Sequence, residues 1–290
     1  MSFISPKILL RRLGLKPKKA WGQHFLLHPH QAQRIVAALS LRLEDLVVEI
    51  GAGLGALTVF LAREAQKVVA LERDQALAQF LKEELLAAAG GVQVLCQDVL
   101  EFEFLKLSQE AGRTLKVVGN LPYQITSPLM FKLIRERAAV AQAVLMVQQE
   151  VGDRLLASPG TKDYGILSVL MQYHFLVTRL FSLTPANFYP APQVASVVLN
   201  LTPQQTIPAA RDENLLHQVV KAGFATRRKT LNNTLVAQAA TFGLTPEEMR
   251  HILLSLDINP QRRGETLSVA EFVAVSNRIV TAAVGGGPGS

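Results

Sequence analysis

The feature that most constrains the fold is an alternation of short apolar runs with helical stretches between residues 46 and 147. Five runs rich in Val, Leu and Ala fall at 46–50, 67–71, 92–96, 115–119 and 141–147. Helical stretches fall between them at 56–65, 74–89 and 128–137. Strands without polar alternation are typical of a parallel sheet that is covered on both faces. The sequence therefore predicts an α/β protein with a doubly wound, mostly parallel sheet.

The pattern changes after residue 147. Two helical stretches, 150–157 and 165–173, precede two apolar strands at 175–183 and 194–201, which a Pro-rich loop joins and which we expect to pair antiparallel. Helices are expected at 213–240, 246–256 and 268–280, with Thr245 and Ser268 in sequences typical of N-caps. We predict four regions: a basic N-terminal arm and helix contributing to the site (1–43), the α/β domain (44–205), a helical domain (206–284) and a disordered tail (285–290).

Small and acidic residues follow the first three predicted strands. Gly51, Gly53 and Gly55 stand in a strand-to-helix turn, where a missing side chain lets a ligand approach the backbone. Glu72 lies at the end of the second strand and Asp98 follows the third, where their carboxylates can accept hydrogen bonds from a ribose and from an adenine amine. The loop lacks the G-x-G-x-x-G spacing of a dinucleotide site, so a ligand with ribose but no phosphates, such as S-adenosylmethionine, fits better. The simpler interpretation is an ordinary strand-to-helix turn without a ligand, in which the carboxylates are solvated or act as caps.

The tetrapeptide at 120–123 follows the fourth predicted strand directly. The Asn120 side-chain oxygen and the Leu121 carbonyl are two acceptors that could take hydrogen bonds from an exocyclic amine. Such bonds would draw the amine nitrogen towards tetrahedral geometry and localise a lone pair that the base otherwise delocalises. Pro122 fixes the turn, and Tyr123 offers a flat face to a base. A proline turn with a buried tyrosine is the simpler interpretation of the tetrapeptide alone.

Positive charge is concentrated in two parts of the chain. Thirty Lys and Arg against 23 Asp and Glu give a net charge of +7. The first part is the N-terminal arm, where no acidic residue precedes Glu44. A second cluster, which we expect on a helix, contains Lys221, Arg227, Arg228 and Lys229. An excess of this kind favours polyanionic partners such as nucleic acid. A solvated surface is the simpler interpretation of each cluster.

Composition also bears on the compartment. The single cysteine, Cys96, can form no disulfide within the chain, which fits a reducing environment. The long charge-free stretch at 180–210 contains five prolines, so we expect no membrane span. A basic arm without acids is also typical of mitochondrial targeting, but here it runs directly into residues 21–26, which we assign to the site. We expect a soluble, cytoplasmic monomer.

Together these motifs resemble those of the ribosomal RNA adenine dimethyltransferases, and within that family the bacterial enzymes of the small subunit. The resemblance covers nearly the whole chain. Besides the glycine loop, Glu72, Asp98 and N-L-P-Y at 120–123, it rests on KKAWGQHFL at 18–26, PANFYPAPQV at 185–194, FATRRKTL at 224–231 and RGE at 263–265. The combination is far more specific than any single motif.

The resemblance implies a Rossmann-like class I methyltransferase fold with a seven-stranded, mostly parallel sheet. It implies S-adenosylmethionine as methyl donor, without a metal. The implied reaction is N6,N6-dimethylation of two adjacent adenines in the 3′-terminal hairpin of 16S ribosomal RNA, in a pre-30S particle and with a role in small-subunit biogenesis. Residues 44–205 would form the methyltransferase domain, and residues 206–284 would recognise RNA.

The resemblance also implies roles for individual residues. Cofactor binding would involve His24, Leu26, Gly51, Gly53, Glu72, Asp98 and Asn120. His24 departs from the family pattern, because many members have Asn at this position. The catalytic group would be Asn120, Leu121, Pro122, Tyr123 and Phe188, with Phe188 stacking on the target adenine opposite Tyr123. RNA contacts would come from Lys18, Lys19, Lys221, Arg227, Arg228 and Lys229.

Other functions stay open at this point. One is a large-subunit ribosomal RNA adenine N6-methyltransferase of the macrolide-resistance type, which the segments at 227–230 and 263–265 oppose. An NAD-linked oxidoreductase is opposed by the spacing of the glycine loop and by the tetrapeptide. The third, a non-catalytic ribosome-assembly factor, is opposed by Asn120, Tyr123 and Phe188, all of which are present.

Overall fold

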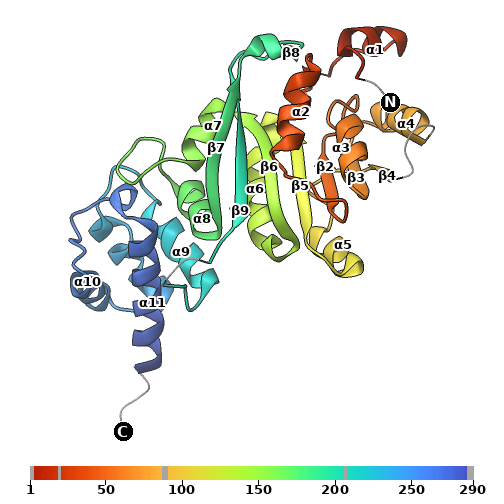
Figure 1. Ribbon diagram of the computed structural model, residues 1–290. Helices are drawn as coiled ribbons and strands as arrows, with labels where there is room; N and C mark the ends of the chain where they lie inside the picture. Colours follow the sequence, from red (N-terminus) through yellow and green to blue (C-terminus); the bar gives the residue numbers. More distant parts are fainter. Residues whose placement is uncertain (1–2, 19–20, 87–90, 206–207, 286–290) are drawn as a thin grey trace. The chain divides into compact units, whose positions relative to one another are not determined.

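The computed structural model describes the chain except for residues 1–2, 19–20, 87–90, 206–207 and 286–290 (Figure 1). The chain divides into two compact units, residues 1–152 with 176–203, and residues 153–175 with 204–290. Residues 153–175 therefore group with the C-terminal helices, whereas the predicted boundary put them in the α/β domain. Of the tail predicted at 285–290, Gly285 ends a helix, and the remainder lies outside the described residues.

A seven-stranded sheet with the order β4-β3-β2-β5-β6-β9-β7 forms the centre of the first unit. Its strands are β2 (Leu46–Ile50), β3 (Lys67–Glu72), β4 (Val92–Cys96), β5 (Leu115–Asn120), β6 (Val140–Gln148), β7 (Phe175–Leu183) and β9 (Ser196–Pro203). Strands β2 to β6 pair in parallel, and β9 runs antiparallel to β6. The predicted mostly parallel sheet is confirmed.

The direction of the crossovers decides where a ligand can bind. The connection from β2 to β3 through α3 (Thr58–Glu64) runs one way across the sheet, and that from β5 to β6 through α6 (Thr126–Arg135) runs the other way. Because such connections are right-handed, the two helices lie on opposite faces. The strand order therefore reverses between β2 and β5, and open sheets bind ligands beside such a reversal.

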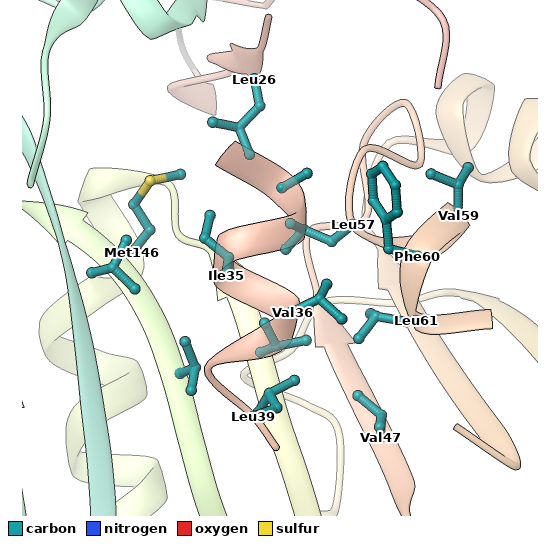
Figure 2. Close-up of a cluster of buried hydrophobic side chains, with 14 of the residues drawn as sticks. Leu26, Ile35, Val36, Leu39, Val47, Leu57, Val59, Phe60, Leu61 and Met146 are labelled. Atoms are coloured by element: carbon teal, nitrogen blue, oxygen red, sulfur yellow. The ribbon is translucent and has the colours of Figure 1, made fainter. Parts of the chain in front are cut away.

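One face of the sheet is covered by a buried apolar cluster, shown in Figure 2. Helix α2 (Pro29–Ala37) inserts Ile35 and Val36 into it, and Leu39 follows just after the helix. Side chains of α3 complete the layer over Val47 of β2. Helix α4 (Gln75–Leu86) and α1 (Pro6–Arg12) contribute to a second cluster. Helix α5 (Phe104–Ala111), which the sequence analysis missed, ends at Gly112 with a left-handed C-cap.

A small two-stranded sheet joins the N-terminal arm to the Pro-rich loop. Strands β1 (Phe25–Leu26) and β8 (Phe188–Tyr189) pair antiparallel, with Leu26 opposite Phe188. The Leu27 N–H also donates to the Asn187 carbonyl at 2.8 Å. Two segments that are far apart in the sequence are thereby fixed beside each other.

The second unit is helical, with α8 (Ile166–His174), α9 (Glu213–Gly223), α10 (Pro246–Ser255) and α11 (Val269–Gly285), while α7 (Gln149–Leu155) spans the boundary after residue 152. The helix predicted at 213–240 is wrong, because α9 ends at Gly223. Gly264 packs so closely there that a Cβ on it would lie 2.2 Å from the Gly223 carbonyl oxygen. The capping boxes are confirmed at Thr245 with Glu248 and at Ser268 with Glu271.

None of the helices in the described part of the chain is both long and apolar enough to cross a lipid bilayer.

Candidate functional site

A pocket opens where the strand order reverses, entirely within the first unit. Residues from five segments line it, 21–26, 49–57, 71–73, 97–99 and 120–125, together with Leu77. All seven residues that the sequence analysis assigned to a cofactor are part of this lining: His24, Leu26, Gly51, Gly53, Glu72, Asp98 and Asn120. The carboxyl ends of β2, β3, β4 and β5 thus supply one site, as the topology requires.

The glycine loop turns sharply after β2. Gly51, Gly53 and Gly55 have φ angles of 69°, 57° and 81°, a backbone region that residues with a Cβ rarely enter. The Gly51 N–H donates to the Leu71 carbonyl at 2.9 Å, which ties the loop to the adjacent strand β3. The backbone therefore requires glycine at these positions, and Gly51 and Gly53 line the pocket without side chains.

Glu72 lies at the end of β3 and is 6% exposed. One carboxylate oxygen accepts the Gly53 N–H and the other accepts the Asp74 N–H, both at 2.8 Å. Burial raises the pKa of Glu72 despite these two hydrogen bonds, which lower it. Each carboxylate oxygen offers more than one lone pair. Glu72 therefore fixes the glycine loop and keeps acceptor capacity for a ligand hydroxyl.

Glu49 is a second buried carboxyl on the pocket wall, and the sequence analysis did not assign it. It interrupts the apolar strand β2, is 1% exposed, and accepts the Thr58 Oγ1 hydrogen at 2.6 Å. Burial raises its pKa to about 8, against the bond from Thr58 and with a further contribution from Glu72. At neutral pH the side chain therefore carries a proton. A charged residue type in an otherwise apolar strand was the signal that could have identified it.

This raised pKa makes stability depend on pH. Between about pH 4.5 and 8 the unfolded chain releases a proton that folded Glu49 retains, so the free energy of unfolding decreases as pH rises, by up to about 1.4 kcal/mol per pH unit. We expect Glu49→Gln, which cannot titrate, to lack this contribution. Urea unfolding at pH 5.5, 6.5 and 7.5 should show that the free energy of unfolding of the variant increases relative to that of the wild type as pH rises. The exposed Glu64→Gln is the control, and a constant difference between Glu49→Gln and wild type would contradict the assignment.

Asp98 combines a structural contact with a place on the pocket wall. Its Oδ1 accepts the Leu100 N–H at 2.9 Å, the turn contact that the simpler interpretation expects. Its Oδ2 lies 3.7 Å from Nη1 of Arg73, whose guanidinium lies 4.6 Å from the Trp21 ring centroid. Arg73 and Trp21 both line the pocket. Neither was assigned, although Trp21 stands in the quoted N-terminal motif and Arg73 follows Glu72.

Asn120 ends β5 with a defined side-chain orientation. Its Nδ2 donates to the backbone carbonyl of His24 at 2.7 Å. Because a carbonyl only accepts, the amide nitrogen must face His24, and Oδ1 is the acceptor that the side chain can offer to a substrate. The Leu121 N–H donates to the Met146 carbonyl at 3.0 Å and anchors the tetrapeptide on β6.

Tyr123 and His24 lie against each other beside Asn120. Their rings stack with centroids 5.8 Å apart, and Nδ1 of His24 lies 2.7 Å from the Pro190 carbonyl oxygen. Since that oxygen only accepts, Nδ1 carries the hydrogen and donates it. Pro122 packs on Gly22, whose φ is 62°. His24 thus connects the tetrapeptide to the Pro-rich loop through its ring and to Asn120 through its backbone.

Phe188 does not lie where the sequence analysis expected a stacking surface. Its side chain is 3% exposed and belongs to the apolar cluster under α2, together with Leu26. The pairing of β8 with β1 holds it there. The structure brings Asn120 and Tyr123 together, but it buries Phe188 in the core.

The residues expected to contact RNA fall into different environments. Lys18 lies beside Trp21, with Nζ 2.9 Å from Asp74, and Lys19 lies outside the described residues. Lys221 is exposed in the last turn of α9. Arg227, Arg228 and Lys229 are exposed in a turn after α9 instead of on the expected helix, and Arg227 forms a 3.1 Å ion pair with Glu265.

Among the described residues, no three His, Cys, Asp or Glu side chains are arranged so that they could hold a metal ion.

The geometry agrees with the comparisons to known proteins. A family model described as ribosomal RNA adenine dimethylase matches residues 14–279. Ribosomal RNA small subunit methyltransferase A of Geobacter metallireducens is 42% identical over 279 residues, covering 96% of this chain and all of the relative. The protein of the same name from Bacillus cereus (strain B4264) is 42% identical over 278 residues, covering 94% and 95%.

Solved structures give the same result for the fold. A dimethyladenosine transferase from Plasmodium falciparum superposes with a TM-score of 0.77 at 25% identity, covering 89% of this chain and 98% of that one. The 23S rRNA methyltransferase ErmE gives a TM-score of 0.67 at 22% identity, covering 88% and 99%. A matched model over most of the chain and relatives at 42% identity establish the family. The chain belongs to the ribosomal RNA adenine dimethylases, a family of S-adenosylmethionine-dependent methyltransferases.

Proposed function

We propose that this chain transfers methyl groups from S-adenosylmethionine to N6 of two adjacent adenines in the 3′-terminal hairpin of small-subunit ribosomal RNA, within a pre-30S particle in the cytoplasm. The observation that carries the proposal is Asn120, whose amide is fixed by His24 so that Oδ1 is left for a substrate amine beside the pocket. The choice of the small subunit rests on relatives that carry this name and cover almost the whole chain.

The pocket has the chemistry that S-adenosylmethionine requires. Glu72 would accept hydrogen bonds from the ribose hydroxyls, and Asp98 would accept one from the adenine amine. Gly51 and Gly53 of the left-handed glycine loop, which line the pocket without side chains, would lie beside the methionine part. Leu26 and Leu77 add apolar wall. When bound, the cofactor supplies an electrophilic methyl group on a sulfonium.

The side chains then act on the target amine. Asn120 Oδ1 and the Leu121 carbonyl would accept the two hydrogens of the unmethylated amine, and one of these oxygens would accept the single hydrogen left after the first transfer. Either contact localises the nitrogen lone pair for in-line attack on the methyl carbon. The nitrogen–carbon bond forms as the carbon–sulfur bond breaks, and the proton leaves to solvent after transfer. Asn is no general base at neutral pH, so the acceleration comes from positioning and from preorganised acceptors. Tyr123 would stack on the base. Stacking by Phe188 would require its ring to leave the core.

RNA recognition is assigned to the exposed turn of the second unit. Neutralising Arg228 and Lys229 together should lower RNA affinity and flatten its salt dependence. The slope of log K against log salt concentration should decrease in magnitude by about 0.7 to 0.9 for each phosphate that the protein no longer neutralises. Cofactor affinity should not change. Filter binding of a small-subunit RNA hairpin at several salt concentrations measures the slope. Arg278→Gln, at an exposed position on α11, is the matched control, and an unaltered slope in the double variant would make the turn a plain solvated surface.

One experiment tests the proposed reaction directly. The protein is incubated with labelled S-adenosylmethionine and unmethylated small subunits, and the labelled nucleotides are mapped. We expect label on two adjacent adenines of the 3′-terminal hairpin, up to four methyl groups per particle. Small subunits without label, together with label on large-subunit RNA in a parallel reaction, would favour the macrolide-resistance type of activity. Binding to the particle without label would favour an assembly factor without catalysis.

A further inference from the structure

Asp74 combines near-complete burial with an unusual number of partners. The residue is 3% exposed and stands between β3 and α4, two positions after Glu72. Its Oδ2 lies 2.9 Å from Nζ of Lys18 and accepts a hydrogen bond from Nε2 of Gln23 at 3.1 Å. Its Oδ1 accepts the Ala76 N–H of α4 at 3.1 Å. One carboxylate therefore ties the N-terminal arm to the start of a helix.

These contacts join the parts of the cofactor pocket that come from distant segments. The Asp74 N–H donates to Glu72 at 2.8 Å, on the ribose side of the proposed site. Gln23, which Asp74 holds, precedes His24, whose carbonyl orients the amide of Asn120. The backbone N–H of Lys18 in turn donates to Oε1 of Gln23 at 2.8 Å. A continuous path of hydrogen bonds and chain neighbours thus runs from Glu72 to Asn120.

The charge balance at Asp74 depends on Lys18. Burial would raise the pKa of Asp74, but the hydrogen bonds from Lys18 and Gln23 outweigh burial, so the pKa lies below its usual value. The Asp74 side chain is 5% exposed and that of Lys18 is 47% exposed. Lys18 is therefore the removable half of the pair, since its ammonium can return to water at little cost while the carboxylate cannot.

The only tryptophan of the chain reports on this arrangement. Two cations lie over the Trp21 ring, with Lys18 Nζ 4.3 Å and Arg73 Cζ 4.6 Å from its centroid. Trp21 also lines the pocket. Because the 290 residues include one Trp, the tryptophan fluorescence of the protein comes from this place alone.

From this geometry we infer that Asp74, through its pair with Lys18, is a positioning residue that holds residues 21–24 against the cofactor pocket. Asp74 is not part of the pocket lining, so it acts through Gln23 and Glu72. The inference rests on the proposed function, and it assigns Lys18 to cofactor binding instead of to RNA. Loosening the pair should weaken cofactor binding without changing the electrostatics of RNA binding.

The test compares Lys18→Gln, Lys18→Arg, Asp74→Asn and the Lys18→Gln/Asp74→Asn double variant, with S-adenosylhomocysteine as the probe in calorimetry and Trp21 fluorescence. Each of Lys18→Gln and Asp74→Asn should weaken binding by about 10-fold, the loss of one charge-assisted hydrogen bond. The double variant should bind no more weakly than the worse single variant, because the two residues act as one pair. Lys18→Arg should restore most of the affinity.

Controls separate this role from plain structural support and from RNA contact. Lys16→Gln, an exposed lysine of the same arm, should leave the affinity for S-adenosylhomocysteine unchanged. Methylation assays should show a raised KM for S-adenosylmethionine in Lys18→Gln, with an unchanged salt slope of RNA binding. Wild-type affinity in Lys18→Gln, additive losses in the double variant, or an altered salt slope with unaltered cofactor affinity would each overturn the inference. Failure of the wild type itself to bind the probe would instead refute the proposed function. If Asp74→Asn does not fold, the two Lys18 variants decide the outcome.

Discussion

Asn120→Ala should bind RNA nearly as well as the wild type and yet lose about 100-fold to 1000-fold in the rate of methyl transfer at saturating S-adenosylmethionine, the usual cost of removing one preorganised group from a transition state. The amide Nδ2 is bound to the His24 carbonyl at 2.7 Å, which leaves Oδ1 for the substrate amine. That oxygen matters most when the amine nitrogen becomes tetrahedral and positive. Ground-state binding barely depends on it.

Single-turnover methylation of unmethylated small subunits measures this effect without interference from product release. Tyr123→Phe is the matched control, because it keeps the ring that stacks on His24 and removes only the hydroxyl. We expect a mild effect from it. A rate near that of the wild type in Asn120→Ala would show that Asn120 does not take part in the chemistry. A strongly reduced rate in Tyr123→Phe would mean that the hydroxyl takes part.

The α/β part of the fold could be predicted because its local signals agree with each other. All five parallel strands were predicted to within one residue, since their runs are rich in apolar residues and are separated by helices and glycine turns. The prediction failed where tertiary packing overrides local pattern. Helix α9 ends at Gly223, where Gly264, 41 positions later in the chain, packs against its backbone. Helix α5, of eight residues, was not predicted.

The candidate site, too, could be predicted from the sequence only in part. Residues directly after strands were predictable, because parallel strands bring their carboxyl ends to one edge and so gather Gly51, Glu72, Asp98 and Asn120. The contribution of the N-terminal arm was not predictable from the residues alone, and it came from the resemblance. Phe188 shows the limit of that approach, since the motif assigns it a function but the structure buries it through the pairing of β8 with β1.

Asp74 was not predicted at all, for a physical reason. An Asp before a helix is locally explained as a cap, and the Ala76 N–H does bind it. Nothing in the local sequence says that Lys18 and Gln23, more than 50 residues earlier, also converge on the same carboxylate. Long-range polar contacts of this kind have no periodic signal, so they become visible only in the folded chain.

Glu72→Ala should have the largest effect on cofactor affinity. The substitution removes the carboxylate that we assign to the ribose hydroxyls, and it also leaves the buried N–H groups of Gly53 and Asp74 without their acceptor. Loss of one hydrogen bond to a charged group costs about 1.5 to 3 kcal/mol, which corresponds to about 10-fold to 150-fold weaker binding. The glycine loop should also loosen, and the urea midpoint of the variant should fall.

Calorimetric titration with S-adenosylmethionine measures the affinity, and filter binding measures whether RNA is still bound. RNA affinity should stay nearly intact, because Glu72 is buried in the first unit and the basic turn after α9 belongs to the second. Glu83→Ala, at an exposed carboxylate on α4, removes the same charge without touching the pocket and should change neither quantity. Glu72→Gln should fall between the wild type and Glu72→Ala, because its amide oxygen can still accept one backbone N–H while its NH₂ group must face another donor. Unchanged cofactor affinity in Glu72→Ala would remove this carboxylate from the binding site, whatever its part in holding the loop.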